Sequence, residues 1–248
     1  MASCLGRFGS CGILVCRATG FIGKSASKAD KVLEGFGEIN NVVRNSLKLA
    51  SMHSSPSSEH QGGLTSGISI CNDISGTITV GRAACKWVRL CSGEMIFCLR
   101  DDGTFDRDSE GKLKTKPVLS VASSVFSLAS KTLSVACFGN QKSLWRLGKH
   151  ASAIGLASDV TSMASTSFSL LSSAVQLRDI VREGRSSIGT RRSSVRSLIS
   201  SIIRDALDLT ATPLESGMVN AGITGLTVGC SLSLLGSVLG IVNIILDD

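Results

Sequence analysis

Apolar side chains recur every three or four residues along much of this chain, which is the period of an α-helix. Residues 30–52 predict an amphipathic helix with Ser27 as a candidate N-cap. Its apolar face holds Val32, Phe36, Ile39, Val43 and Leu47. Residues 53–63 are rich in Ser, Pro and Gly and predict a loop. Residues 64–99 again have helical spacing, and we predict a helix there that breaks near Gly76 or Gly81.

The middle of the chain alternates serine with aliphatic residues. Residues 118–139 hold one charged residue, Lys131, and residues 151–177 hold one, Asp159. This pattern fits a pair of membrane-embedded helices, and it also fits the buried helices of a soluble bundle. The segment before this pair, residues 100–116, is the most polar of the chain. Its acidic residues lack the spacing of a calcium loop, so we predict a solvated turn.

The C-terminal stretch, residues 216–246, has no charged side chain. As a helix it would reach ~46 Å, against a hydrocarbon core of ~30 Å. Three arrangements remain open: one tilted membrane crossing, a turn back near residues 229–233, or the core helix of a soluble bundle. Glycines at four-residue spacing predict close helix packing, at Gly225, Gly229, Gly236 and Gly240.

An arginine-rich amphipathic segment comes before this stretch, and Pro213 is expected to break the chain between them. A basic helix next to a hydrophobic span is typical of a flank that contacts anionic lipid headgroups. The arginines expected to do so are Arg178, Arg182, Arg185, Arg191, Arg192, Arg196 and Arg204. The alternative is the solvated face of a soluble helix.

Composition argues against several classes of function. The net charge of +7 suits anionic lipid or nucleic acid, but aromatic residues make up only 4% of the chain, so base stacking is poorly supplied and we expect no nucleic-acid partner. Nine cysteines without a CxxC pair and three histidines without ligand spacing predict neither a metal nor a cofactor site. His150 is the only histidine near the long helical segments, and no catalytic motif accompanies it. We therefore predict no enzyme.

Several segments resemble a known family. The opening MASCLGRFGSCG, the segment KADKVLEGF (28–36), GTITVGRA (76–83) and the basic helix that ends in Pro213 are similar to chlamydial inclusion membrane proteins of the class I accessible protein 1 type. The resemblance implies a type III-secreted virulence protein in the vacuole membrane of an intracellular bacterium. It also implies segments that face host cytosol and no catalysis. The run LWRLGK (144–149) and the helices after it are similar, more weakly, to the peroxin-eleven family, which elongates membranes.

These patterns predict an all-α bundle of about six helices with a membrane-associated C-terminal half. We divide the chain into a flexible leader with a secretion signal (1–29), N-terminal helices with a polar loop (30–116) and a hydrophobic helical region (117–248). The expected partners are the lipid bilayer, host proteins and a second copy of the chain. A soluble helical adaptor is the main alternative.

Overall fold

The part of the chain that the structure describes folds into six long α-helices. The computed structural model describes residues 2–54, 60–182 and 188–246. The elements within these ranges are α1 (Ala2–His53), α2 (His60–Cys91), α3 (Val118–Gln141), the 3₁₀ turn η1 (Gly148–His150), α4 (Ala151–Arg182), α5 (Ile188–Glu215) and α6 (Gly222–Leu246). The predicted all-α fold with six helices is confirmed.

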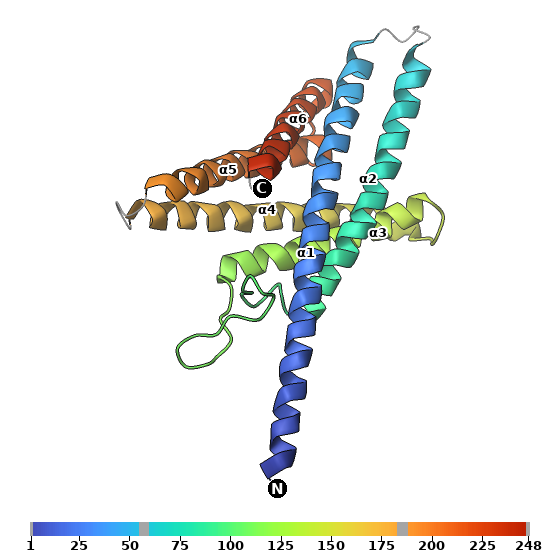
Figure 1. The fold of residues 1–248 in the computed structure, drawn as a ribbon. Helices are drawn as coiled ribbons and strands as arrows, with labels where there is room; N and C mark the ends of the chain where they lie inside the picture. Colours follow the sequence, from blue (N-terminus) through green and yellow to red (C-terminus); the bar gives the residue numbers. More distant parts are fainter. Residues whose placement is uncertain (1, 55–59, 183–187, 247–248) are drawn as a thin grey trace.

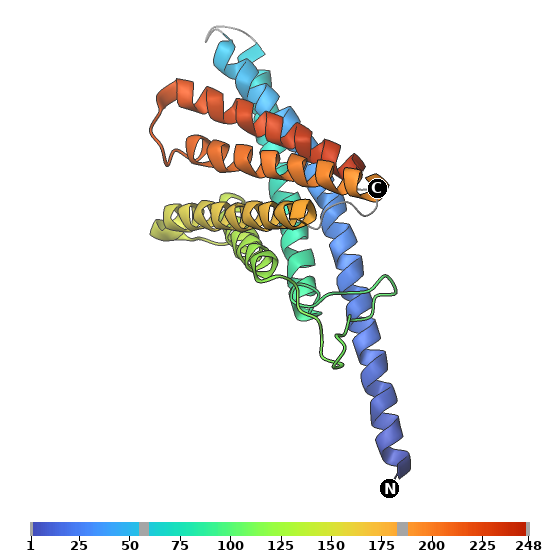
Figure 2. The ribbon, with the colours of Figure 1, turned by 90° about the vertical axis from the view of Figure 1, so that its left-hand side faces the viewer.

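The helices form a closed ring. Successive helices contact one another all along the chain, and the first helix, α1, also contacts the last, α6. In Figure 1, α1 and α2 run side by side, α3 and α4 cross them, and α5 lies next to α4. Figure 2 shows α4, α5 and α6 stacked on one side of the α1–α2 pair, with the first turns of α1 projecting beyond the other helices. This ring leaves a space that all six helices can line.

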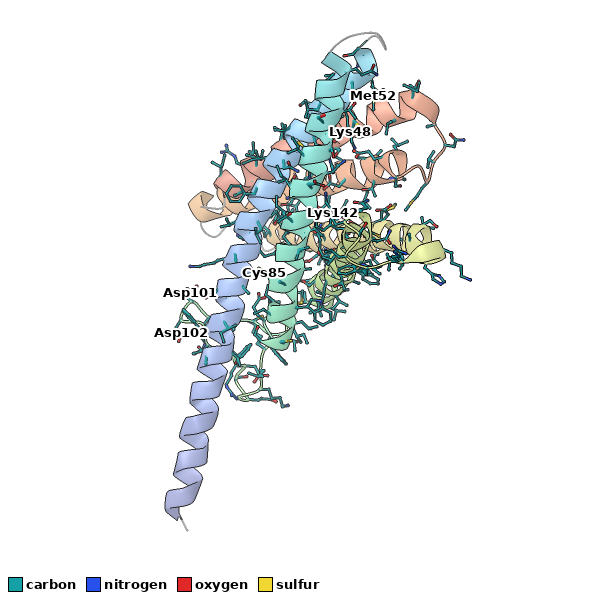
Figure 3. All side chains as sticks on the ribbon, turned by 90° about the vertical axis from the view of Figure 1, so that its right-hand side faces the viewer. Lys48, Met52, Cys85, Asp101, Asp102 and Lys142 are labelled. Carbon is teal, nitrogen blue, oxygen red and sulfur yellow. The ribbon has the colours of Figure 1, made fainter. Side chains whose placement is uncertain are left out.

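Polar contacts close the ring near the end of α1. Asn45 donates a hydrogen bond of 2.9 Å to the Ser233 hydroxyl of α6. The Lys48 ammonium lies 3.7 Å from the Glu215 carboxylate at the end of α5. Figure 3 labels Lys48 near the end of α1, beside the last two helices. The two ends of the sequence are therefore joined through side chains.

The helix ends follow local chemistry. Ser54 donates its N–H and its hydroxyl to the Ala50 carbonyl and so satisfies an acceptor at the end of α1. Pro117 precedes α3, where its missing N–H costs nothing. The break expected at Pro213 is wrong by a few residues, because α5 continues to Glu215 before the chain turns at Gly217, whose φ is +74°.

The break predicted near Gly76 or Gly81 is also wrong, because α2 is continuous. Both glycines lie where another side chain comes close to the helix backbone. A Cβ at Gly76 would overlap the ring of Phe138 in α3, and one at Gly81 would lie 3.0 Å from Leu33 in α1. Glycine here permits close packing and does not interrupt the helix.

The polar segment after α2 folds back on itself through isolated antiparallel bridges, such as Phe97 with Thr115 and Arg107 with Leu113. This segment packs against α1, where the Gly103 carbonyl meets the backbone at Gly20. The prediction of a flexible leader over residues 1–29 needs correction, because α1 begins at Ala2. The helix continues through this segment although the segment contains five glycines.

Candidate functional site

The molecule places polar residues inside and large apolar residues outside. Among the described side chains, six apolar residues are buried, against twelve polar or charged ones. The predicted apolar face of α1 points outward, since Val32 is 59% exposed and Phe36 60%. Comparable outward apolar residues occur on all the other helices, such as Ile70, Leu171 and Leu235. This order is the reverse of a water-soluble protein.

The opposite face of α1 carries acidic residues at four-residue spacing, which places them above one another on one side of the helix. Asp30 and Glu38 are buried. Asp30 accepts a hydrogen bond of 2.9 Å from Arg82, and it also lies 3.2 Å from Lys86 and 3.2 Å from Arg89. Three cations of α2 therefore converge on one buried carboxylate.

A second ion-pair cluster joins α1 to α5. The Arg204 guanidinium lies 3.2 Å from Glu34 and also bonds Glu38. Arg82 reaches Glu34 as well, at 3.5 Å, so the two clusters form one network across three helices. Buried charges need such partners, because an isolated charge away from water is strongly unfavourable.

The network sets the protonation of its members. Burial raises the pKa of Asp30, but Lys86 and Arg82 outweigh it and hold this pKa below its ordinary value. The same balance lowers the pKa of Glu34, through Arg82 and Arg204. Asp208 of α5 behaves in the opposite way: burial raises its pKa to about 6, because Arg204 offsets burial only in part from 3.9 Å.

Serines form the wall opposite these charges. Ser123 of α3 and Ser165 of α4 exchange hydrogen bonds with each other's carbonyls, at 3.0 and 2.8 Å. Further along, the hydroxyls of Ser134 and Ser158 are 2.7 Å apart. The alternation of serine with aliphatic residues thus gives α3 and α4 a hydroxyl face toward each other and the interior, and an apolar face outward.

Three adjoining cavities occupy the interior, with volumes of about 470, 450 and 380 Å³. The first two share lining residues from four helices: Arg82, Lys131, Ser162, Thr166, Arg204 and Asp208. The second and third share Arg44 and Asp159. The second cavity is lined from all six helices. These volumes lie within the range of small-molecule sites, but the walls are far more polar than such sites usually are.

Lys131 has a distinctive place among the lining residues. It is the single charged residue of α3, and it lines both of the larger cavities. No hydrogen bond or ion pair to Lys131 occurs among the residues that the structure describes. Its ammonium group is therefore available to a ligand or to water.

The predicted headgroup arginines do not share one face. Arg178, Arg182 and Arg196 are exposed. Arg185 and the side chains of Arg191 and Arg192 lie outside what the structure describes. The prediction that Arg204 contacts lipid headgroups is wrong, because its guanidinium lies in the interior network and does not face the outer surface.

The four glycines predicted to pack helices lie where α6 approaches its neighbours. A Cβ at Gly229 would lie 3.0 Å from Leu214, and one at Gly236 would lie 2.8 Å from the Asp208 carboxylate. A Cβ at Gly240 would lie 3.1 Å from Glu38 in α1, and one at Gly225 would meet Ala221, just before α6. α6 therefore comes closest to α5 and α1 along its glycine-bearing side.

Within the described ranges, two helices are long and apolar enough to cross a membrane, by length and composition: Val118–Gln141 and Gly222–Ile245. α6 is continuous, so the turn considered near residues 229–233 does not occur. No group of three His, Cys, Asp or Glu side chains in the described ranges is arranged to hold a metal. His150 is exposed in η1, away from the three cavities.

Comparison of the chain with family models, with curated proteins and with solved structures finds no match. The resemblances noted in the sequence therefore stay predictions. Sequence reasoning also missed the interior network, although its signal was present. Acidic residues recur at helical spacing opposite the apolar stripe of the first helix, at Asp30, Glu34 and Glu38. Basic residues recur at helical spacing on the next helix, at Arg82, Lys86 and Arg89.

Proposed function

We propose that this chain is a membrane-inserted helical protein that acts in host interaction or membrane organisation and not in catalysis. The observation that carries the proposal is the outward position of large apolar side chains on all six helices around a charged interior. Lipid tails are a natural surrounding for such an outer surface, whereas water is not. Exposed Val32 and Phe36 on one face of α1, with buried Asp30 on the other, illustrate the arrangement.

The two candidate spans support the same proposal. α3 and α6 each provide 24 residues that would reach ~36 Å as a helix, enough for a bilayer of ~30 Å. The exposed residues Arg178 and Arg182 lie in the last turns of α4, and exposed Arg196 lies in the third turn of α5; anionic headgroups would attract their charge.

The cellular setting follows from the resemblance to chlamydial inclusion membrane proteins. We propose that the protein is secreted through a type III system into the vacuole membrane of an intracellular bacterium and presents segments to host cytosol. The bridged segment 92–117, which is rich in exposed charge, is the part best suited to bind a host protein. Microscopy of the tagged protein in infected cells tests this setting: a rim around the vacuole supports it, and diffuse cytosolic signal contradicts it.

Carbonate extraction tests membrane insertion. We expect the wild-type protein to stay in the membrane pellet at alkaline pH, where peripheral proteins are released. A variant with serine at Val32, Phe36 and Ile39 should be partly released, because it removes outward apolar surface. Ser162→Ala, which changes only the cavity wall, is the matched control and should stay in the pellet. Full release of the wild type would contradict membrane insertion. It would instead favour a soluble adaptor whose apolar outer surface is covered by a partner protein.

Membrane remodelling is a second candidate, favoured by one feature of α5. Ile199 and Ile203 are exposed on this helix together with Arg196, which is the composition of a helix that lies in the interface of a bilayer. Electron microscopy of anionic vesicles mixed with the purified protein tests it. Tubes in the wild type that disappear in Ile199→Ser/Ile203→Ser support remodelling, and unchanged round vesicles rule it out.

A further inference from the structure

We propose that the ring of helices encloses a polar passage along α3 and α4 through which small hydrophilic solutes cross the bilayer, anions in preference to cations. This inference rests on the membrane insertion proposed above. It goes beyond that proposal because anchoring or host binding needs no polar interior. Three properties of the interior carry it: its length, its walls and the position of Lys131.

The length of the polar space matches a bilayer. The three adjoining cavities follow α3 from Ser123 to Gln141 and follow α4 back from Ser173 to Gly155. The stretch of α3 corresponds to ~27 Å of helix, against a hydrocarbon core of ~30 Å. α3 is also one of the two candidate spans. A chain of cavities of this length, alongside a candidate spanning helix, is long enough to reach across most of the hydrocarbon core.

The walls suit water and ions. Hydroxyls of α3 and α4 face charges of α1, α2 and α5 across the first cavity. Three buried wall atoms have no hydrogen-bond partner in the described part of the chain: Arg44 Nε, Asp205 Oδ2 and Glu215 Oε1. Buried polar atoms of this kind are normally satisfied by water. Ionisable residues inside membrane proteins characteristically line such hydrated solute pathways.

Cationic side chains outnumber carboxylates in the lining of the first cavity, six against four, and Lys131 is one of the six. Arg82 is neutralised there by Asp30 and Glu34, and Arg204 by Glu34 and Glu38. Lys131 has no ion-pair partner among the described residues. An unpaired ammonium at this junction attracts anions and repels cations, as rings of basic side chains do in anion pores.

The test uses the full-length protein reconstituted into phosphatidylcholine vesicles. Flotation first establishes insertion, and influx of iodide is then followed by quenching of an enclosed halide-sensitive dye. We expect wild-type influx well above that of protein-free vesicles. In Lys131→Glu we expect iodide influx to fall roughly tenfold, which corresponds to ~1.4 kcal/mol in the barrier. Potassium uptake, read with a potassium-sensitive dye, should rise in the same vesicles.

Two further variants separate the passage from the fold. Ser162→Leu places a branched aliphatic group where the first two cavities meet and should block both ions. Val125→Leu changes the outward side of α3 and should leave influx unchanged. Each variant is compared after flotation and circular dichroism show insertion and wild-type helicity.

The outcomes are distinct. Inserted wild-type protein without influx above protein-free vesicles overturns the passage and leaves the membrane proposal intact. Protein that does not float overturns both. Influx that is the same in the wild type and in Lys131→Glu overturns the anion preference. If Ser162→Leu leaves the influx unchanged, the ions cross outside these cavities, and this result also overturns the passage.

Discussion

Replacing Asp30 tests whether the interior charge network holds the ring together. Asp30 is only 4% exposed and is contacted by Arg82, Lys86 and Arg89. Asp30→Asn keeps the size of the side chain but removes the charge that the three cations share. Breaking a buried ion pair by removing one partner costs ~3–5 kcal/mol, because the other charge stays buried without compensation.

The structure places the cost near the lower end of that range. Arg82 keeps Glu34 as a partner and Arg89 keeps Glu94, so among these three cations Lys86 is the one left without an ion pair to a described residue. We therefore expect the free energy of unfolding to fall by about 3 kcal/mol. The assay is denaturant unfolding in detergent micelles, followed by circular dichroism of the helical signal.

Two companion variants make the result specific. Glu110→Gln removes a carboxylate from an exposed pair, 2.8 Å from Lys112, and should cost less than ~1 kcal/mol. Asp30→Asn combined with Lys86→Met removes the stranded charge and should recover much of the loss. If Asp30→Asn is no more costly than Glu110→Gln, the network does not stabilise the ring and the reasoning fails.

Three more predictions follow from particular positions. Gly76→Ala should destabilise the fold by ~1–3 kcal/mol, because the added methyl overlaps the Phe138 ring of α3. Gly155→Ala, where the added methyl meets open space, should stabilise the fold by ~0.4–1 kcal/mol. Equal thermal unfolding midpoints for the two variants would contradict the packing. Asp208 has a folded-state pKa of about 6 against 3.8 when unfolded, so stability falls as pH rises between these values. Asp208→Asn should therefore stabilise the protein by roughly 1 kcal/mol at neutral pH, after allowance for screening at its partly open side chain. It should have no effect well below pH 3.8, where the carboxyl is protonated in both states, and a pH-independent effect would refute this assignment. The pKa of Glu94 is held below 4.5, since hydrogen bonds from two cations outweigh burial, so its contribution is present above that pH and is lost as pH falls through the folded value. Glu94→Gln should speed hydrogen exchange in residues 92–117 at neutral pH and match the wild type in acid, and equal rates at neutral pH would exclude the role.

The sequence was sufficient to predict helices but not their orientation. The apolar stripe of Val32, Phe36 and Ile39 established that the first long helix has two different faces. Helical periodicity is the same whether the apolar face meets a protein core or lipid, so the pattern did not say which face is inside. Only the burial of Asp30 and the exposure of Phe36 decide the question.

The errors at helix boundaries have a related cause. Glycine and proline were given their usual weight as helix breakers, at Gly76, Gly81 and Pro213. Tertiary packing overrides that preference where Phe138 and Leu33 cover the two glycines. Pro213 stands so near the end of α5 that few backbone hydrogen bonds depend on it. Arg204 was assigned to the surface from local charge density, because its partners on α1 are far away in sequence.

Contact between α1 and α6 has a consequence for biosynthesis. The bond from Asn45 to Ser233 links residues 188 positions apart, and Arg204 finds its partner Glu34 across 170. Closure of such distant contacts is slow, and a ribosome makes the last helix last. Until α6 emerges, Asn45 lacks its hydrogen-bond partner Ser233 and Glu38 lacks its contact with Gly240. The ring is then open between α5 and α1. Closure of the ring must therefore wait until α6 has been made, after the five helices that precede it.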